Sequence, residues 1–426
     1  MRVVRVNLLL AVEGAALAMA APAHASAPIS AHAMVHTCCT PKGEQERIFS
    51  EAAALGVGYI RVDVELNGIF SASDAEPDWD PLDRVIALAK EHHLRVLAIL
   101  IVPHDYTNAE QFGQQSGAVA EHAGDAIDHW EVLNEPDGDW AWGGTPEQYA
   151  RMLSAAHDAI KAKAPGDQIV LGGLQKPHKP EWLQRVFDTP GADAIHKFDI
   201  ANIHLRGTVD AVVSRYDEFR SWIAARGFTG PLWVTEHGYA ADPAVQSDPA
   251  YKGGEASQGA YLTQSLLGLG EAGAPEVFVT LQDGGLEGEY ATEGLEHIDE
   301  TPGGDYPVTR RAAFGAVRRV VDQWDQLVAW RTEQRDQEQE LRVDQGKAAI
   351  SADEARAMRE KVRAAIASVH AAQLGGVESR VYRARALLAG ARTALLWRSA
   401  VSRWYSQRAD DHAAAALLLK VKIAGG

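Results

Sequence analysis

Short β-favouring runs alternate with amphipathic helical stretches over residues 33–324, and no other feature of the sequence constrains the fold as strongly. The clearest strand covers residues 94–102, a nearly unbroken apolar run of the kind found in a parallel sheet that is covered on both faces. The clearest helix covers residues 145–163, with Thr145 as its N-cap and Pro146 at its first position. This alternation predicts an α/β fold.

The alternation contains eight predicted strands. We expect the strands at residues 34–36, 57–63, 94–102, 128–135, 168–174, 198–204, 231–236 and 276–281. We expect helices at residues 41–55, 81–91, 145–163, 208–226, 254–271 and 308–324. Eight strands that alternate with helical stretches over about 300 residues match the size and pattern of a (β/α)8 TIM barrel. A doubly wound open sheet is the alternative, but no GxGxxG or P-loop fingerprint follows any predicted strand.

The start of the chain has the pattern of a secretory signal peptide. Arg2 and Arg5 form a positive start. Residues 6–20 are mostly apolar, and Ala23-His24-Ala25 is a small-x-small cleavage site. The apolar region is too short and too interrupted for a membrane span. We therefore expect residues 1–25 to be removed and the mature chain to be secreted.

Residues 325–426 differ in composition from residues 26–324. They contain 17 Lys and Arg against 12 Asp and Glu, and no proline; their richness in Ala, Arg, Gln and Glu favours helix. Ser351 and Glu354 form a capping-box pattern at the start of one helix, and Gly375-Gly376 separates this helix from a second. We expect a C-terminal helical extension with apolar stripes too irregular for a long coiled coil. It is a candidate surface for docking on an envelope component or for self-association.

The formal net charge of −17 bears on the class of partner. An acidic chain repels phosphates, so this charge argues against a nucleic-acid partner and suits a neutral or cationic substrate. With 46% hydrophobic and 23% charged residues, the chain has the composition of a globular protein.

The chain has two cysteines, and they are adjacent. A bridge between neighbours requires a strained ring, so we expect Cys38 and Cys39 to be two small buried thiols near the end of the first strand. Their spacing excludes a zinc site of the CxxC type.

Polar side chains stand at the predicted C-terminal ends of the strands, where barrel enzymes build their active sites. These are Arg61 and Asp63, His104 and Tyr106, Asn134 and Glu135, His204 and Arg206, Glu236 and His237, and Gln282 and Asp283. Glu135 and Glu236 are the most informative, because we expect them to be the last residues of the fourth and seventh strands. Those strands face each other across a barrel mouth. Two carboxylates about 5–5.5 Å apart are what a retaining glycosidase uses as acid/base and nucleophile.

The segments around these two glutamates carry a resemblance to a known clan. Trp130-Glu-Val-Leu-Asn-Glu-Pro136 and Trp233-Val-Thr-Glu-His-Gly-Tyr239 resemble the (β/α)8 glycoside hydrolases whose catalytic glutamates end strands four and seven, with families 39 and 5 nearest. The resemblance follows the strand order, and the two glutamate motifs are its specific parts. It implies that residues 26–324 form a glycoside hydrolase domain that acts on a carbohydrate without a metal or another cofactor. It also implies Glu135 as acid/base and Glu236 as nucleophile.

The resemblance assigns roles to three further residues. Arg61 is similar to the clan's arginine on strand two, which holds the nucleophile. Asn134 corresponds to the residue that contacts the sugar hydroxyl next to the anomeric carbon, and His204 to the histidine of strand six. The physical requirements agree, because a nucleophilic carboxylate must stay ionised and a nearby cation favours its charged form.

The sequence departs from the clan at two places. Arg206 stands two residues after His204, where clan members often have a tyrosine; this change moves a positive charge towards Glu236. Leu281-Gln282 stands at the end of strand eight, where many members have a tryptophan as a sugar platform. Gln282 is therefore a candidate for substrate contact. Aromatic residues in the loops are candidates for stacking on sugars, and they are Tyr106, Trp140, Trp142 and Tyr239.

Two other functions fit parts of the sequence. A catalytically inactive, sugar-binding barrel tethered by its helical tail is favoured by the two departures and disfavoured by the presence of both glutamates. A metal-dependent hydrolase is the weaker alternative, because the sequence has no HExxH motif and His92-His93 falls on a helix behind the barrel.

Overall fold

The computed structural model describes residues 27–71, 76–242, 253–284, 291–298, 308–329 and 331–332. The predicted signal peptide and nearly all of the predicted helical extension at residues 325–426 lie outside these ranges, so both stay predictions. Within the described ranges, no helix combines the length and apolar character that a membrane crossing requires.

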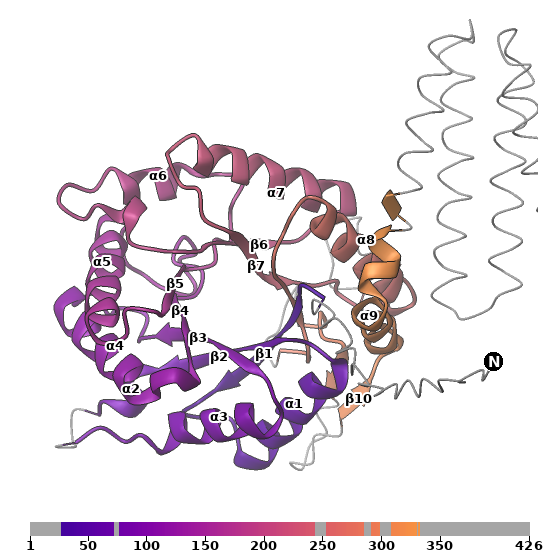
Figure 1. The fold of residues 1–426 in the computed structure, drawn as a ribbon, viewed down its shortest axis with the longest axis horizontal. Coiled ribbons are helices and arrows are strands. Elements are labelled where there is room, and N and C mark those ends of the chain that lie inside the picture. The colour runs from indigo at the N-terminus through magenta and orange to yellow at the C-terminus, as the bar shows by residue number, and fades with distance from the viewer. Residues whose placement is uncertain are drawn as a thin grey trace, which may run out of the picture.

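Eight parallel strands form one sheet that curls into a barrel (Figure 1), which confirms the predicted fold class. The strands are β1 Ile29–His36, β2 Tyr59–Glu65, β3 Arg95–Ile101, β4 His129–Val132, β5 Gln168–Leu171, β6 Ala201–Leu205, β7 Leu232–His237 and β8 Val277–Thr280. Strand β1 lies between β2 and β8. Isolated parallel bridges from Val170 to Ile200 and from Leu174 to Ile203 connect β5 to the β6 side, so the sheet is nearly closed.

Helices surround the barrel on its outside (Figure 1). They are α1 Lys42–Leu55, α2 Leu66–Ile69, α3 Asp80–Glu91, α4 Ala109–Ala123, α5 Pro146–Lys163, α6 Glu181–Phe187, α7 Val209–Ala224, α8 Glu255–Glu271 and α9 Ala312–Asp322, with short 3-10 turns at Gly124–Ala126 and Ala194–His196. The predicted cap of α5 is present as a full capping box between Thr145 and Gln148.

The helix predicted at residues 308–324 begins later than expected. Val308–Arg310 is strand β10, which pairs antiparallel with β9, Glu296–Ile298. Helix α9 follows at Ala312. The sequence analysis did not separate Val308 and Thr309 from the helix, although β-branched residues favour a strand.

Two hydrophobic cores follow from the alternation of side chains along the strands. Residues such as Ile60, Val62 and Val64 face the helices and belong to the large outer core. A smaller cluster fills the barrel interior, mainly from the N-terminal halves of the strands, and consists of Tyr59, Leu97, Val170, Ile200, Trp233 and Phe278. The interior is therefore packed at one end, and the polar strand-end residues gather at the other.

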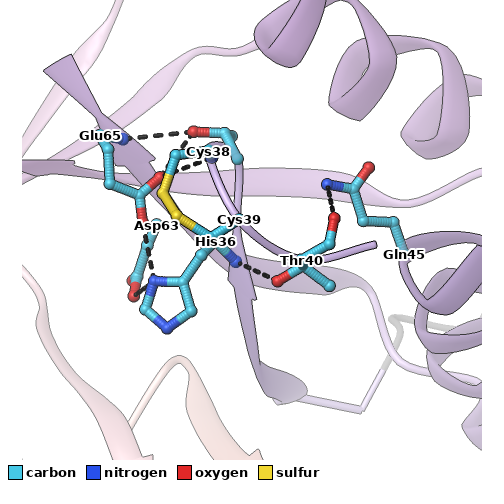
Figure 2. Close-up of a disulfide and its surroundings, with 8 residues drawn as sticks. His36, Cys38, Cys39, Thr40, Gln45, Asp63 and Glu65 are labelled. Atoms are coloured by element: carbon cyan, nitrogen blue, oxygen red, sulfur yellow. Dashed lines mark hydrogen bonds and ion pairs between the residues drawn. A yellow bond between two sulfur atoms is a disulfide. The ribbon is translucent and has the colours of Figure 1, made fainter. Parts of the chain in front are cut away.

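Cys38 and Cys39 form a disulfide immediately after β1 (Figure 2). Both residues are exposed, so the prediction of two buried thiols was wrong on pairing and on burial. The backbone turns here, with the amides of Cys39 and Thr40 both donating to the carbonyl of His36. This turn leaves both side chains on the solvent side of the strand end instead of in the core.

Candidate active site

The backbone places the two glutamates differently from the prediction. Strand β4 ends at Val132, so Glu135 lies three residues beyond it instead of at its last position. Leu133 and Glu135 both have positive φ angles, 63° and 41°, which are uncommon for residues other than glycine and cost about 1–3 kcal/mol each. Glu236 lies inside β7, one residue before its end. The strained turn after β4 directs the Glu135 carboxylate towards β7.

The two carboxylates meet in the barrel mouth. One oxygen of Glu135, one oxygen of Glu236 and one ring nitrogen of His204 all lie within 4.8 Å of one another. Both glutamates are buried, with exposed fractions of 4% and 7%. This separation fits the short spacing of about 5–5.5 Å that lets one carboxylate attack while the other transfers a proton.

Glu135 has hydrogen-bond contacts with three side chains. His204 Nδ1 lies 2.7 Å from Glu135 Oε1. The Trp140 indole and the Gln175 amide both donate to Oε2, at 2.8 and 3.1 Å. The Trp140 side chain is 59% exposed and is the most exposed large hydrophobic residue in the described ranges. Trp140 therefore contacts the buried Glu135 carboxylate and is also exposed to solvent at the rim of the barrel mouth.

Glu236 has a different environment, because two arginines contact it. Arg61 Nη1 donates to Glu236 Oε1 at 2.9 Å, and Arg206 Nη2 donates to Oε2 at 3.0 Å. Burial by itself raises the pKa of the Glu236 carboxyl. The electrostatic effects of His204, His32, Arg61 and Arg206, in falling order, outweigh burial and hold the pKa well below its ordinary value. Burial also lowers the pKa of His32, whose Nε2 lies 3.7 Å from Glu236, to about 3. His32 is thus neutral near pH 7, and the arginines are the permanent cations.

Arg61 is fixed by a second buried carboxylate that the sequence analysis missed. Glu131 accepts two hydrogen bonds from Arg61, at 2.8 and 2.9 Å, and a further one from the Gly173 amide at 3.0 Å. Asn134 Oδ1 accepts a further hydrogen bond from the Arg61 guanidinium at 2.8 Å. A charged residue between Trp130 and Val132 in a short apolar strand was the available signal, since buried charges require partners.

Arg206 is likewise held by a carboxylate that the sequence analysis did not identify. Its Nε and Nη2 atoms donate to both oxygens of Glu293, at 2.9 to 3.1 Å. Burial raises the pKa of Glu293, and Arg206 opposes that rise. Glu293 is fully buried and lies in the segment between β8 and β9, outside any predicted strand. No local sequence pattern marks it.

The remaining predicted contact residues lie in less direct positions. Gln282 Oε1 accepts a hydrogen bond of 2.7 Å from Arg47 of α1. Tyr239 is buried, and its ring packs 4.9 Å from that of Tyr261. Tyr106 is partly buried against the core, and its carbonyl accepts a bond from the buried Trp142 indole. Among the four candidate loop aromatics, Trp140 is therefore the exposed one that also touches a glutamate.

Several described clusters have donor atoms close enough for a cation: Glu135 with His204 and Glu236, His36 with Asp63 and Glu65, and Glu46 with Glu91 and His92. In the first cluster, arginines already donate to both oxygens of Glu236. Their charge disfavours a metal ion between the two glutamates.

Solved glycoside hydrolases have a similar fold. A family 39 glycoside hydrolase from the gut symbiont Bacteroides cellulosilyticus WH2 aligns with a TM-score of 0.52 and 16% identity, over 68% of this chain and 64% of that one. A glucosidase from Croceicoccus marinus aligns with a TM-score of 0.53 and 16% identity, over 65% and 63%. A family 1 β-glucosidase from Thermotoga maritima aligns with a TM-score of 0.52 and 14% identity, over 66% and 86%.

The likeness to these proteins is one of structure. The sequence matches no protein-family model and has no significant similarity to a curated protein. The chain spans slightly less than two thirds of the family 39 enzyme and of the Croceicoccus marinus glucosidase. By its fold, the chain resembles the (β/α)8 glycoside hydrolases, including members of families 39 and 1.

Proposed function

We propose that this protein is a retaining glycoside hydrolase that cleaves O-glycosidic bonds of an oligo- or polysaccharide. The observation that carries the proposal is a pair of buried carboxylates, Glu135 and Glu236, with oxygens within 4.8 Å of each other and with unlike partners. Glu236 faces two arginines, which suits an ionised nucleophile. Among the described residues, the hydrogen-bond partners of Glu135 are His204, Trp140 and Gln175 and include no arginine, which suits a group that must hold and release a proton.

The reaction has two steps in this proposal. Glu135 gives its proton to the glycosidic oxygen as the bond to the leaving group breaks, while an oxygen of Glu236 forms a bond to the anomeric carbon. Glu135, now a carboxylate, then takes a proton from water as the water oxygen bonds to the anomeric carbon. The bond to Glu236 breaks, and both carboxyl groups return to their starting states.

We also propose that the mature chain is secreted. The N-terminal pattern of residues 1–25 supports this compartment. The disulfide between Cys38 and Cys39 supports it independently, because disulfides persist in oxidising surroundings and are rare in the cytosol.

The decisive experiment traps the covalent intermediate. A panel of 2-deoxy-2-fluoroglycosides, including the β-glucoside because two structural neighbours are named glucosidases, is incubated with the protein, and the intact mass is measured. We expect one fluorosugar to add to the wild type, with the label on Glu236 after digestion. Glu236→Gln should not be labelled, whereas the matched exposed change Glu218→Gln on α7 should leave labelling unchanged.

A catalytically inactive, sugar-binding barrel is the second candidate function. It is favoured by Arg206 in place of the clan's tyrosine and by Leu281-Gln282 in place of its tryptophan. The trapping experiment separates the two candidates, because a binding protein takes up no covalent label. Sugar binding without labelling by any member of the panel would favour this candidate over the hydrolase.

A further inference from the structure

Strand β2 carries polar side chains from the catalytic layer up to the rim of the barrel. Tyr59 belongs to the interior cluster, and Arg61 contacts Glu236, so both face inward. Asp63 and Glu65 follow at the same two-residue period and therefore face the same side. At about 3.3 Å per residue, they lie roughly 7 and 13 Å further along the strand than Arg61. They thus form the wall of the mouth above the nucleophile.

The end of β1 completes this wall. His36 is the register partner of Asp63. Its Nδ1 lies 2.7 Å from Glu65 Oε1 and 3.1 Å from Asp63 Oδ2. The other oxygen of Glu65 accepts bonds from the Thr37 hydroxyl at 2.7 Å and from the Cys38 amide at 3.2 Å. Figure 2 shows these contacts beside the disulfide, which is thereby anchored to the wall.

A sugar ring requires an apolar face and fixed hydrogen-bonding groups, and both are present at the disulfide. The two sulfurs and their methylene groups are apolar and polarisable, and Cys38 and Cys39 are exposed. Beside them lie the oriented polar groups of His36, Asp63 and Glu65. Binding sites for small polar ligands combine an apolar face with a few fixed hydrogen-bonding groups.

At the end of the neighbouring strand β8, the described residues Leu281 and Gln282 supply no such face. Leu281, at the end of β8, is fully buried, and Gln282 is bound to Arg47. Strand β1 pairs directly with β8. The disulfide therefore lies one strand away from the place where the clan's tryptophan is missing.

We propose that the Cys38–Cys39 disulfide and the side chains of His36 and Asp63 form a sugar subsite at the barrel mouth. This subsite, which rests on the proposed function, holds an uncharged sugar ring next to the ring whose bond is cleaved. One face of the sugar ring packs on the disulfide, and hydroxyl groups of the ring donate hydrogen bonds to the Asp63 carboxylate. Asp63 and Glu65 repel anionic sugars such as uronates at this position.

The test measures binding in the absence of turnover. The full chain carrying Glu236→Gln is titrated by calorimetry with four neutral tetrasaccharides: cellotetraose, laminaritetraose, mannotetraose and xylotetraose. We expect at least one to bind. In the same background, Cys38→Ser with Cys39→Ser should weaken that binding about tenfold. Reduction of the cysteine-containing protein with a phosphine should weaken it equally, and the same phosphine should leave the double serine variant unchanged.

A second measurement keeps this proposal separate from the proposed function. A monosaccharide fluorosugar occupies the cleaved position alone, so its labelling rate should be equal in the wild type and the double serine variant. That equality, with matching melting temperatures, also shows that the serine variant is folded. Asp63→Asn retains the disulfide and should weaken tetrasaccharide binding several-fold.

Two results would overturn the subsite: binding that is unchanged in both the reduced protein and the double serine variant, or failure of all four tetrasaccharides to bind. If no fluorosugar labels the wild type but binding still depends on the disulfide, the hydrolase proposal fails and the subsite stands.

Discussion

Arg206 donates a hydrogen bond of 3.0 Å to Oε2 of Glu236. Arg61 donates to the other oxygen of the same carboxylate, so each oxygen has its own arginine. In the clan that the sequence resembles, a tyrosine often stands at the position of Arg206. Here a permanent charge takes that place, and Glu293 holds it. This arrangement makes the nucleophile hard to protonate, and it leads to the first two predictions.

Arg206→Met should move the acidic limb of the pH profile to higher pH. The nucleophile works only when ionised, and its pKa is held well below its ordinary value by His204, His32 and Arg61 and, to a smaller extent, by Arg206. Removing that charge raises this pKa, so activity is lost at a higher pH as the solution is acidified. We also expect kcat/KM at pH 7 to fall about 100-fold. The measurement is kcat/KM against pH, with the exposed change Arg226→Met as the control; an unmoved acidic limb would contradict the prediction.

Glu293→Gln should reproduce part of that effect without touching the nucleophile. The change removes the negative charge and one of the two acceptor oxygens that orient Arg206, so we expect a fall of about tenfold in kcat/KM. Because Glu293 acts through Arg206, the double variant should be no worse than Arg206→Met alone. Steady-state kinetics on the four proteins of this cycle measure the coupling. Additive losses would show that Glu293 has a separate role.

Trp140 should contribute to catalysis through its hydrogen bond to Glu135 and to substrate binding through its ring. Two substitutions separate these contributions. Trp140→Phe retains an exposed ring but removes the donor to Glu135 Oε2, so we expect kcat to fall several-fold with little change in KM. Trp140→Ala also removes the ring, and KM for an oligosaccharide should then rise about tenfold because sugar stacking is lost. Steady-state kinetics of both variants, on an oligosaccharide that the wild type hydrolyses, test the two predictions. Equal KM values for the two variants would rule out a stacking role.

Glu276 should make the fold less stable at higher pH. Burial raises the pKa of this carboxyl to about 8, and the Ser30 hydroxyl donates to it at 2.7 Å. The folded chain therefore keeps a proton that the unfolded chain releases near pH 4.5, so stability falls as pH rises from about 5 to 8. Since the side chain is partly exposed, we expect a loss of about 2 kcal/mol. In Glu276→Gln this slope should be smaller, and chemical denaturation at pH 5 and pH 8 measures it. A slope equal to that of the wild type would exclude Glu276 as its source.

Local sequence patterns were sufficient to predict most strands and helices of the barrel. The elements that were missed have physical causes. Helix α4 was missed because much of its buried face is small: Gly113 and Gly117 pack closely against Ala155 and Ala159 of α5. A Cβ atom at Gly113 would lie 2.8 Å from the Ala155 carbonyl oxygen. The two helices pack closely through small residues, so α4 lacks the row of large apolar side chains from which an amphipathic helix is recognised in a sequence.

The sequence by itself determined the alternation of strands and helices and the two glutamate motifs, because periodicity and the effect of proline act over a few residues. It also pointed to Arg61, His204 and Arg206 as neighbours of the site. Only the tertiary structure decided that Glu131 and Glu293 hold the two arginines. Only the tertiary structure paired Cys38 with Cys39, beside Glu65. Such contacts join segments far apart in the chain or depend on a single turn, and no local pattern encodes which buried charges meet when the barrel closes.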